Sequence, residues 1–255
     1  MEIKTDKFHI VGLSDVGRKR TNNEDNFELG EEYAVLCDGM GGHTRGEVAS
    51  QIIATKLFDY FEANKKKDIK DFEVGELIKN GFAYAKQEFI RLEDKLQSFG
   101  MGTTLTGVFF WDSDNELISR ATVFNLGDSR AYLFNNLGQT PCLKLLTEDH
   151  NSAFELMTHW HGKYIEEIYR QLPYKNQLTR CVDSTSTDTP DIHTIEIVKG
   201  ERILLCSDGL QELTDEEIKN ILANNDIKTA AEKLIEETLN KDANDNVTVI
   251  VVEKL

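Results

Sequence analysis

Four aspartates in this sequence lie where a predicted buried strand begins or ends. Asp38 follows the apolar run YAVLC, Asp128 follows VFNLG, Asp208 follows ILLCS, and Asp245 precedes VTVIVV. Glycine adjoins the first three of these aspartates, so the backbone beside them can turn tightly. Each aspartate by itself is an ordinary turn residue. A chemical role for the set therefore depends on whether the four strand ends converge.

Glu24 and Asp25, in NNEDNF, add two carboxylates at the edge of another short predicted strand. If all these groups converge, their mutual repulsion would be costly unless cations neutralise it. Ligand sets made only of oxygen favour Mg²⁺ or Mn²⁺ over zinc or copper. Two such ions about 3.5 to 4 Å apart can deprotonate a bridging water for attack on a phosphoryl group. The carboxylates are therefore candidates for metal-dependent phosphoester hydrolysis.

Arg20, in GRKRTNNED, lies just before this carboxylate pair, and its guanidinium could bind two oxygens of a phosphate. The alternative is that residues 18–20 form an ordinary solvated basic run. A structural Ca²⁺ site also stays open, although the sequence contains no EF-hand loop. Other phosphate chemistries lack their motifs, since no cysteine has an arginine six residues later and GxxxxGK[ST], GxGxxG and GxSxG are absent.

The composition is that of an acidic folded protein. The 255 residues include 29 Lys+Arg against 45 Asp+Glu, which gives a formal net charge of −16, and 40% of them are hydrophobic. This acidity disfavours nucleic acid as a partner, because phosphates repel it. No apolar run approaches the roughly 20 residues that span a bilayer, and no signal peptide is evident. We therefore expect a cytoplasmic protein without membrane contacts, in which the four cysteines are reduced thiols.

The elements that must position the carboxylates are strands interrupted by pairs of helices. Helices are predicted from 46 to about 63, over 78–99 and over 230–239. A further helix is predicted to begin at a capping box formed by Thr214 and Glu217. Residues 151–176 are predicted to be a helical excursion. The strands between 103 and 147 have short connections that favour an antiparallel meander. Two antiparallel sheets flanked by helices accommodate this order. Strands are predicted at 8–13, 33–37, 103–111, 118–127, 129–134, 142–147, 192–198, 202–206 and 247–253.

Seven segments resemble, in order, motifs of the metal-dependent serine/threonine protein phosphatases of the protein phosphatase 2C type. DGMGGHxxGE is similar to the bacterial branch. The resemblance covers essentially the whole chain and implies a single α+β domain over 1–255. It implies a four-layer α-β-β-α sandwich with a flap-like excursion at about 148–178. The segments are SDVGRKRTNNEDNF (14–27), VLCDGMGGHTRGEVAS (35–50), GMGTTLTGV (100–108), NLGDSRAYL (125–133), LTEDHN (146–151), LLCSDGL (204–210) and DNVTVIVV (245–252).

The resemblance also implies a two-metal site. Asp38 would bridge two Mn²⁺ or Mg²⁺ ions, and the Gly39 carbonyl, Asp208 and Asp245 would complete the protein ligands. Asn246 would help to position Asp245 without binding the metal itself.

Further roles follow from the same resemblance. Glu24 and Asp25 would hold metal-bound waters or ligate weakly. Asp128, together with Asp208, would hold a third and looser ion, as in bacterial members. Arg20 matches the arginine that binds the phosphate.

Two departures from the family pattern concern proton transfer and the flap. Met40 occupies the position at which many eukaryotic members have the histidine that is proposed as general acid, and methionine cannot donate a proton. A metal-bound water or another group must then protonate the leaving alkoxide, with His43 as the candidate side chain. In LPYKNQLTR, Leu172 precedes Pro173 where relatives commonly have histidine.

The activity implied by the resemblance is hydrolysis of phosphoserine and phosphothreonine in proteins, including a cognate serine/threonine kinase. The attacking group would be a metal-bridging water or hydroxide, and we expect a monomer. The alternative is a catalytically silent phosphatase-like binding or signalling module, which predicts no hydrolysis. A noncatalytic Ca²⁺-stabilised acidic domain would explain the charge and the aspartate turns, but not Arg20 or the ordered motifs.

Overall fold

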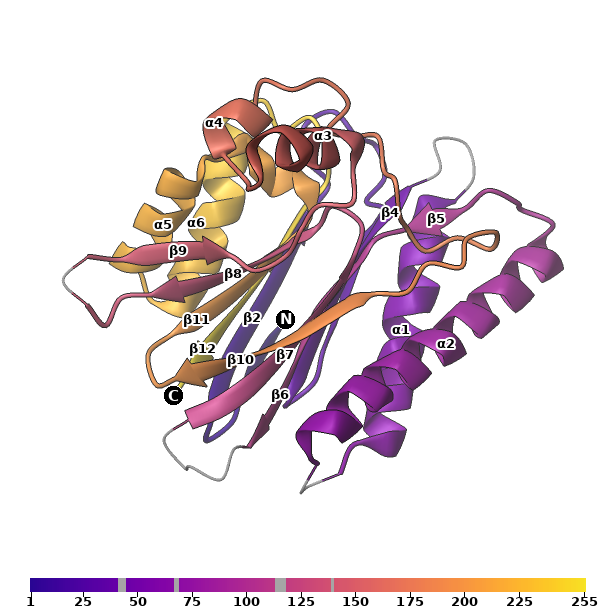
Figure 1. Ribbon diagram of the computed structural model, residues 1–255, viewed down its shortest axis with the longest axis horizontal. Coiled ribbons are helices and arrows are strands. Elements are labelled where there is room, and N and C mark those ends of the chain that lie inside the picture. The colour runs from indigo at the N-terminus through magenta and orange to yellow at the C-terminus, as the bar shows by residue number, and fades with distance from the viewer. Residues whose placement is uncertain (41–44, 67–68, 113–117, 139) are drawn as a thin grey trace.

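Two antiparallel sheets form the centre of the computed structural model, which describes residues 1–40, 45–66, 69–112, 118–138 and 140–255 (Figure 1). The first sheet has the order β1 (Glu2–Lys4), β2 (Phe8–Asp15), β12 (Val247–Lys254), β11 (Arg202–Cys206), β8 (Arg130–Asn135) and β9 (Cys142–Leu145). The second has the order β10 (Asp191–Val198), β7 (Ile118–Leu126), β6 (Leu105–Asp112), β4 (Tyr33–Met40) and β3 (Asp25–Leu29), and β5 (Gly102–Thr103) pairs with β4.

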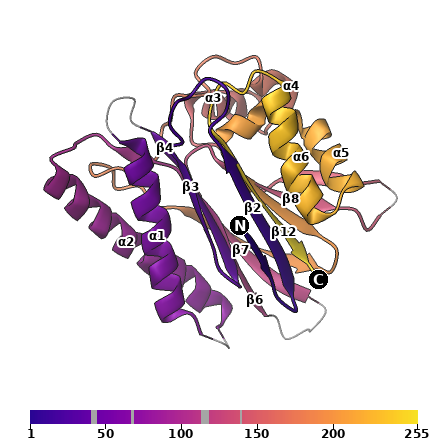
Figure 2. The ribbon, with the colours of Figure 1, turned by 180° about the vertical axis from the view of Figure 1, so that it is seen from behind.

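Two pairs of helices cover the outer faces of the sheets (Figure 2). The helices α1 (Gly46–Asn64) and α2 (Asp71–Leu96) pack on the second sheet, and α5 (Asp215–Asn224) and α6 (Ile227–Asn240) pack on the first. The predicted four-layer α-β-β-α sandwich is therefore confirmed.

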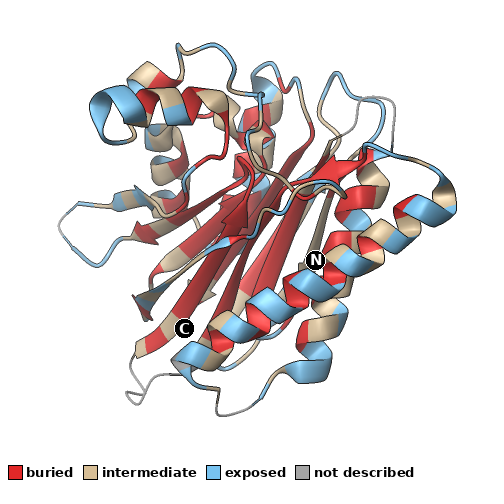
Figure 3. Cartoon of the chain, turned by 45° about the vertical axis from the view of Figure 1, so that its right-hand side comes forward, coloured by how far each residue is buried: buried red, intermediate tan, exposed pale blue. Residues whose placement is uncertain are grey.

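The strands are buried on both faces, which explains why they read as nearly continuous apolar runs. In β4, Val35 and Cys37 face the helices α1 and α2, whereas Ala34 and Leu36 face the other sheet. Figure 3 shows the resulting buried band along the central strands, with the exposed residues of α2 on its outer side. This double burial fixes the register of the strands, and with it the position of the residues at their ends.

The predicted meander between 103 and 147 is wrong at one point. β6 pairs with β7 and β8 pairs with β9, but β7 and β8 belong to different sheets. The chain crosses between the sheets at Gly127, which has φ +118, and a Cβ there would lie 2.6 Å from Thr104 Cβ. Glycine is needed for this crossing, and the crossing places Asp128 between the two sheets.

The second helix also differs from its predicted bounds. Its buried face contains Ile78, Phe82 and Phe89, as the periodicity indicates. It begins at Asp71 and ends at Leu96, before Gly100, with Gln97 in the left-handed conformation (φ 49). Phe99 lies beyond the helix and is 59% exposed, so it is not part of the core.

The flap segment, residues 148–178, contains the helix α3 (Ser152–His161) and the short helix α4 (Glu166–Tyr169). Figure 1 shows both helices at the end of the sheets where β4 ends. The 3₁₀ helix η1 (Asp208–Glu212) follows β11 at the same end, and α5 begins with the predicted Thr214–Glu217 capping box. Within the described residues, no helix is long and apolar enough to cross a membrane.

Candidate metal centre

The four strand ends that carry aspartates meet at one end of the sandwich. They surround a cavity of about 270 Å³. Asp25 and Asp38 are directly paired across β3 and β4, so the register of these strands brings their carboxyls together. The convergence on which a chemical role depends is thus present. Seven predicted site residues line the cavity, namely Arg20, Glu24, Asp38, Gly39, Asp128, Asp208 and Asp245.

Crowding of carboxylates perturbs their ionisation. Burial, followed by repulsion from Asp25 and Asp208, raises the pKa of Asp38 well above its usual range. Burial and the neighbouring Asp245 raise the pKa of Asp208 to about 7. Burial and the charge of Asp208 likewise raise the pKa of Asp128 well above its usual range. Each of these shifts favours the protonated carboxyl, so without cations the crowding opposes ionisation of the group.

Asp25 lies beneath the cavity and is 5% exposed. Its Oδ2 accepts hydrogen bonds from Ser207 Oγ (2.8 Å) and Thr248 Oγ1 (2.7 Å), whereas its buried Oδ1 has no partner. Burial raises the pKa of Asp25 to about 6. An ionised carboxylate with an unsatisfied buried oxygen needs a cation or a proton close by.

The donor set fits hard divalent cations. The Asp38 carboxyl lies close to both Asp25 and Asp208, and two neighbouring carboxyls can hydrogen-bond only when one of them holds a proton. Among the described residues, no three His, Cys, Asp or Glu side chains are already arranged as a metal cage. The partnerless Asp25 oxygen and the all-oxygen set favour Mg²⁺ or Mn²⁺ over softer metals.

Glycine is required at position 39. A Cβ on Gly39 would lie 2.2 Å from the Gly46 carbonyl oxygen and 2.6 Å from that of Glu24. The Gly39 N–H donates to the Glu24 carbonyl (3.0 Å), which joins β4 to the turn before β3. The Gly39 carbonyl thus belongs to a tightly packed backbone at the edge of the cavity.

Asn246 joins two carboxylate-bearing loops. Its Oδ1 accepts from the Glu24 N–H (2.9 Å), and its Nδ2 donates to the carbonyls of Val16 and Asn22, each at 2.9 Å. These bonds fix the loop that carries Asp245 against the loop that carries Glu24.

Arg20 is engaged with a carboxylate of the cavity. Its Nη2 lies 2.7 Å from Asp245 Oδ2, and about half of its side chain is exposed. The hydrogen bond from Arg20 to Asp245 raises the pKa of the guanidinium. Residues 18–20 are therefore more than a solvated basic run, because Arg20 reaches the cavity and Arg18 Nε donates to the Leu239 carbonyl.

Three cavity residues were not predicted to line it. Asn176 and Leu178 come from the flap segment, and Thr104 comes from the start of the predicted strand at 103–111. Thr104 Oγ1 accepts from the Asp38 N–H (3.0 Å) and contacts Ser129 Oγ (2.8 Å), so it holds β4 near the crossing between the sheets. The segments LPYKNQLTR and GMGTTLTGV contain these three residues and were the features of the sequence that could have indicated them. Met40 lines the cavity as well, whereas His43 lies outside the described residues.

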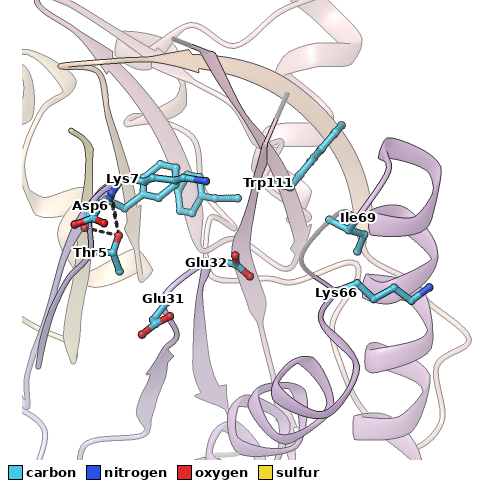
Figure 4. A pocket seen from close by; sticks show the side chains of 10 residues that line it. Thr5, Asp6, Lys7, Glu31, Glu32, Lys66, Ile69 and Trp111 are labelled. Carbon is cyan, nitrogen blue, oxygen red and sulfur yellow. Dashed lines mark hydrogen bonds between the residues drawn. The ribbon is translucent and has the colours of Figure 1, made fainter. Parts of the chain in front are cut away.

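A separate cavity of about 210 Å³ lies at the opposite end of the sheets (Figure 4). Lys7 and Glu31 lie on one side of it, and Lys66, Ile69 and Trp111 lie on the other. Its charged groups have both signs, and it shares no described residue with the carboxylate cavity. It therefore has no part in the chemistry of the carboxylates.

Comparisons with known proteins match this chain over most of its length. The family model described as Protein phosphatase 2C matches residues 17–247. The serine/threonine protein phosphatase PstP of Mycobacterium tuberculosis is 33% identical over 247 residues, which are 96% of this chain but 45% of PstP. The chain thus spans less than half of the length of PstP.

Two further similarities extend over nearly the whole of both chains. The serine/threonine phosphatase stp of Listeria welshimeri is 31% identical over 255 residues, covering 97% of this chain and 96% of stp. A crystal structure of the catalytic domain of PstP in complex with two manganese ions has a TM-score of 0.80 and 29% identity, covering 98% of this chain and 99% of that one.

Proposed function

This chain belongs to the protein phosphatase 2C family, and from that premise we propose that it is a metal-dependent hydrolase of phosphoserine and phosphothreonine in proteins. The observation that carries the proposal is the convergence of acidic side chains around one cavity with Arg20 at its edge. A catalytically silent binding module would not need so many costly carboxylates. The single domain over 1–255 is part of the same proposal.

The metal ligands in this proposal are oxygen atoms that line the carboxylate cavity. Asp38, Asp208, Asp245 and the Gly39 carbonyl would hold two divalent ions, and Asp128 would help to hold a third. When bound, these ions activate the attacking water and neutralise charge on the phosphoryl group. Manganese is supported by the PstP complex with two manganese ions, and magnesium by the oxygen-only ligands.

Arg20 is the proposed phosphate-binding residue. In the structure its guanidinium pairs with Asp245, the same carboxylate that is proposed to bind metal. Once Asp245 ligates a cation, its attraction for Arg20 weakens, and the guanidinium can bind two phosphate oxygens. Glu24 and Asp25 would hold metal-bound waters or ligate weakly, and Asn246 positions the loop that carries Asp245.

Protonation of the leaving alkoxide needs a group other than Met40, whose thioether lacks an acidic proton. A metal-bound water or His43 is proposed for this step. The remaining parts of the proposal are a cognate serine/threonine kinase among the substrates, a monomeric state and a cytoplasmic location. A phosphatase of phosphoserine and phosphothreonine reverses the product of such a kinase.

The test is hydrolysis of p-nitrophenyl phosphate with Mn²⁺, Mg²⁺, Ca²⁺ or EDTA, repeated with Asp208→Asn. Turnover that requires Mn²⁺ or Mg²⁺ and is lost in Asp208→Asn is expected. A folded protein that is silent with every metal would contradict the hydrolase and favour the silent module. Stabilisation by Ca²⁺ alone, without Mn²⁺-dependent turnover, would favour the noncatalytic Ca²⁺ domain. A panel of phosphopeptides then establishes whether serine and threonine phosphates are the substrates.

A further inference from the structure

A second cavity, of about 280 Å³, adjoins the carboxylate cavity. Asn176, Asp208 and Asp245 line both cavities, so the two form one continuous depression. The second cavity lies between the flap segment on one side and η1 with the loop before β12 on the other. A polypeptide with its phosphorylated residue in the first cavity would therefore place a neighbouring residue in the second.

Arg170 fixes the two walls of this second cavity to each other. Its Nε donates to Glu166 Oε1 (2.7 Å), and its Nη1 and Nη2 donate to the carbonyls of Gln211 (2.9 Å) and Leu213. Gln211 Nε2 in turn approaches the Asp128 carbonyl (3.4 Å). Because these bonds occupy each nitrogen of the Arg170 guanidinium, this side chain holds the cavity together and has little capacity left for a ligand.

Lys175 is the cation of the cavity that is left without an acidic partner. Its half-buried ammonium contacts the Arg170 carbonyl at 3.4 Å, and no carboxylate of the described chain lies within ion-pairing distance of it. Glu212 lies in the same cavity, where its Oε1 accepts from Asn244 Nδ2 (3.2 Å). Asp208 and Asp245 would be neutralised once cations bind. The loaded cavity would therefore present Lys175 as its unpaired positive group.

The backbone before Lys175 is strained. Tyr174 has φ 68, which is rare for a bulky residue, and its side chain is 65% exposed. The Gln177 N–H closes a turn on the Tyr174 carbonyl (3.1 Å). This turn places Lys175 in the second cavity and Asn176 at the junction of the two cavities. Backbone strain of this kind is often found where a structure holds a ligand-contacting side chain in place.

We propose that the second cavity is a subsite for the residue next to the phosphorylated one, and that Lys175 selects an anionic side chain there. The proposal rests on the phosphatase function proposed above. The shared chemistry of the ligand is a negative charge, supplied either by Asp or Glu or by a second phosphate. Asn176, at the junction, is the proposed positioning residue for the peptide backbone between the two subsites.

The test compares kcat/KM for four phosphothreonine peptides that differ at the adjacent positions, which carry aspartate, a second phosphate, alanine or lysine. The wild type is expected to favour the aspartate or doubly phosphorylated peptide over the alanine peptide by about fivefold, the upper end of the range for a partly exposed ion pair. A larger gain with the second phosphate than with aspartate identifies phosphate as the source. Lys175→Gln is expected to bring these ratios close to one.

Two further variants test whether the preference for anionic peptides depends on the charges of the second cavity. Lys199→Gln removes an exposed lysine outside both cavities and should retain the wild-type preference. Glu212→Gln should strengthen the preference for anionic neighbours, because it removes the opposing carboxylate. Equal kcat/KM for all four peptides, or a preference for lysine that Glu212→Gln abolishes, would overturn the subsite. Absence of Mn²⁺-dependent hydrolysis of p-nitrophenyl phosphate by the wild type would instead contradict the phosphatase, and the subsite with it.

Discussion

Asp208→Asn is expected to stabilise the metal-free protein at pH 8 while it abolishes turnover. Burial and repulsion raise the pKa of Asp208 from 3.8 to about 7. A carboxyl with a higher pKa in the folded state binds its proton more tightly there than in the unfolded chain. The ionised form of Asp208 therefore lowers the free energy of unfolding, and this loss grows as the pH rises from 3.8 to about 7. Asparagine cannot ionise, so the variant does not undergo this loss of stability.

The size of the effect follows from the difference between the two pKa values. A shift of about 3 units at about 1.36 kcal/mol per unit corresponds to about 4 kcal/mol at pH 8, where the loss is complete. At pH 4.5 the same relation gives about 1 kcal/mol, because this pH lies only slightly above the unfolded pKa of 3.8 and little of the loss has accumulated. The stability gained by Asp208→Asn should thus shrink several-fold between pH 8 and pH 4.5.

The assay is urea unfolding in EDTA at both pH values, with Asp6→Asn as a matched control at an exposed turn. The control should change the free energy of unfolding little at either pH. Excess Mn²⁺ should stabilise the wild type much more than Asp208→Asn, since the variant has lost a proposed ligand. A variant that is equally destabilised at both pH values would refute the idea that Asp208 is held in an electrostatically unfavourable state.

Three other perturbations test separate parts of the structure. Arg20→Ala should raise the phosphopeptide KM by about tenfold or more with a smaller change in kcat, as measured by steady-state kinetics; a fall confined to kcat would contradict its role in binding phosphate. Arg170→Lys removes the forked contacts to two carbonyls and should speed hydrogen exchange in the flap segment; unchanged exchange there would show that Arg170 does not hold the flap. An alkylating reagent should label exposed Cys142 in the native protein and leave buried Cys37 and Cys206 unmodified until unfolding, as followed by mass spectrometry; labelling of all three at one rate would contradict this burial.

The fold was predictable where a single stretch of chain contains its own signal. The run around Tyr33–Cys37 is apolar on both faces, and it forms a strand between a sheet and a helical layer. The Thr214–Glu217 capping box starts a helix as expected. The split between β7 and β8 was not predictable from short connections, because it depends on the close packing of Gly127 against Thr104, which is distant in sequence. Local patterns indicate a strand, but not the sheet to which it belongs.

The candidate metal centre was predictable to a similar extent. Aspartates at strand ends identify the acidic side of the cavity, because strand ends of packed sheets meet at common edges. The bonds of Asp25 to Ser207 and Thr248 join residues about 180 and 220 positions apart, and no local pattern contains that information. Lys175 and Asn176 escaped prediction because they fall in the helical excursion predicted over 151–176, whereas the last helix there ends at Tyr169 and these two residues lie in a turn beyond it. The position of the flap segment depends on Arg170 and on contacts with η1.

Protons and cations compete for the same carboxylates, and this competition links stability to function. Without metal, the raised pKa values of Asp208 and Asp25 mean that protons partly neutralise the cluster. Metal binding must displace those protons, so apparent metal affinity should fall as the pH drops below about 7. The apolar layers between and outside the sheets supply the stability that offsets the acidic end. A cluster that is unfavourable without cations gains most from binding them, so the repulsion that weakens the metal-free fold also strengthens its preference for divalent ions.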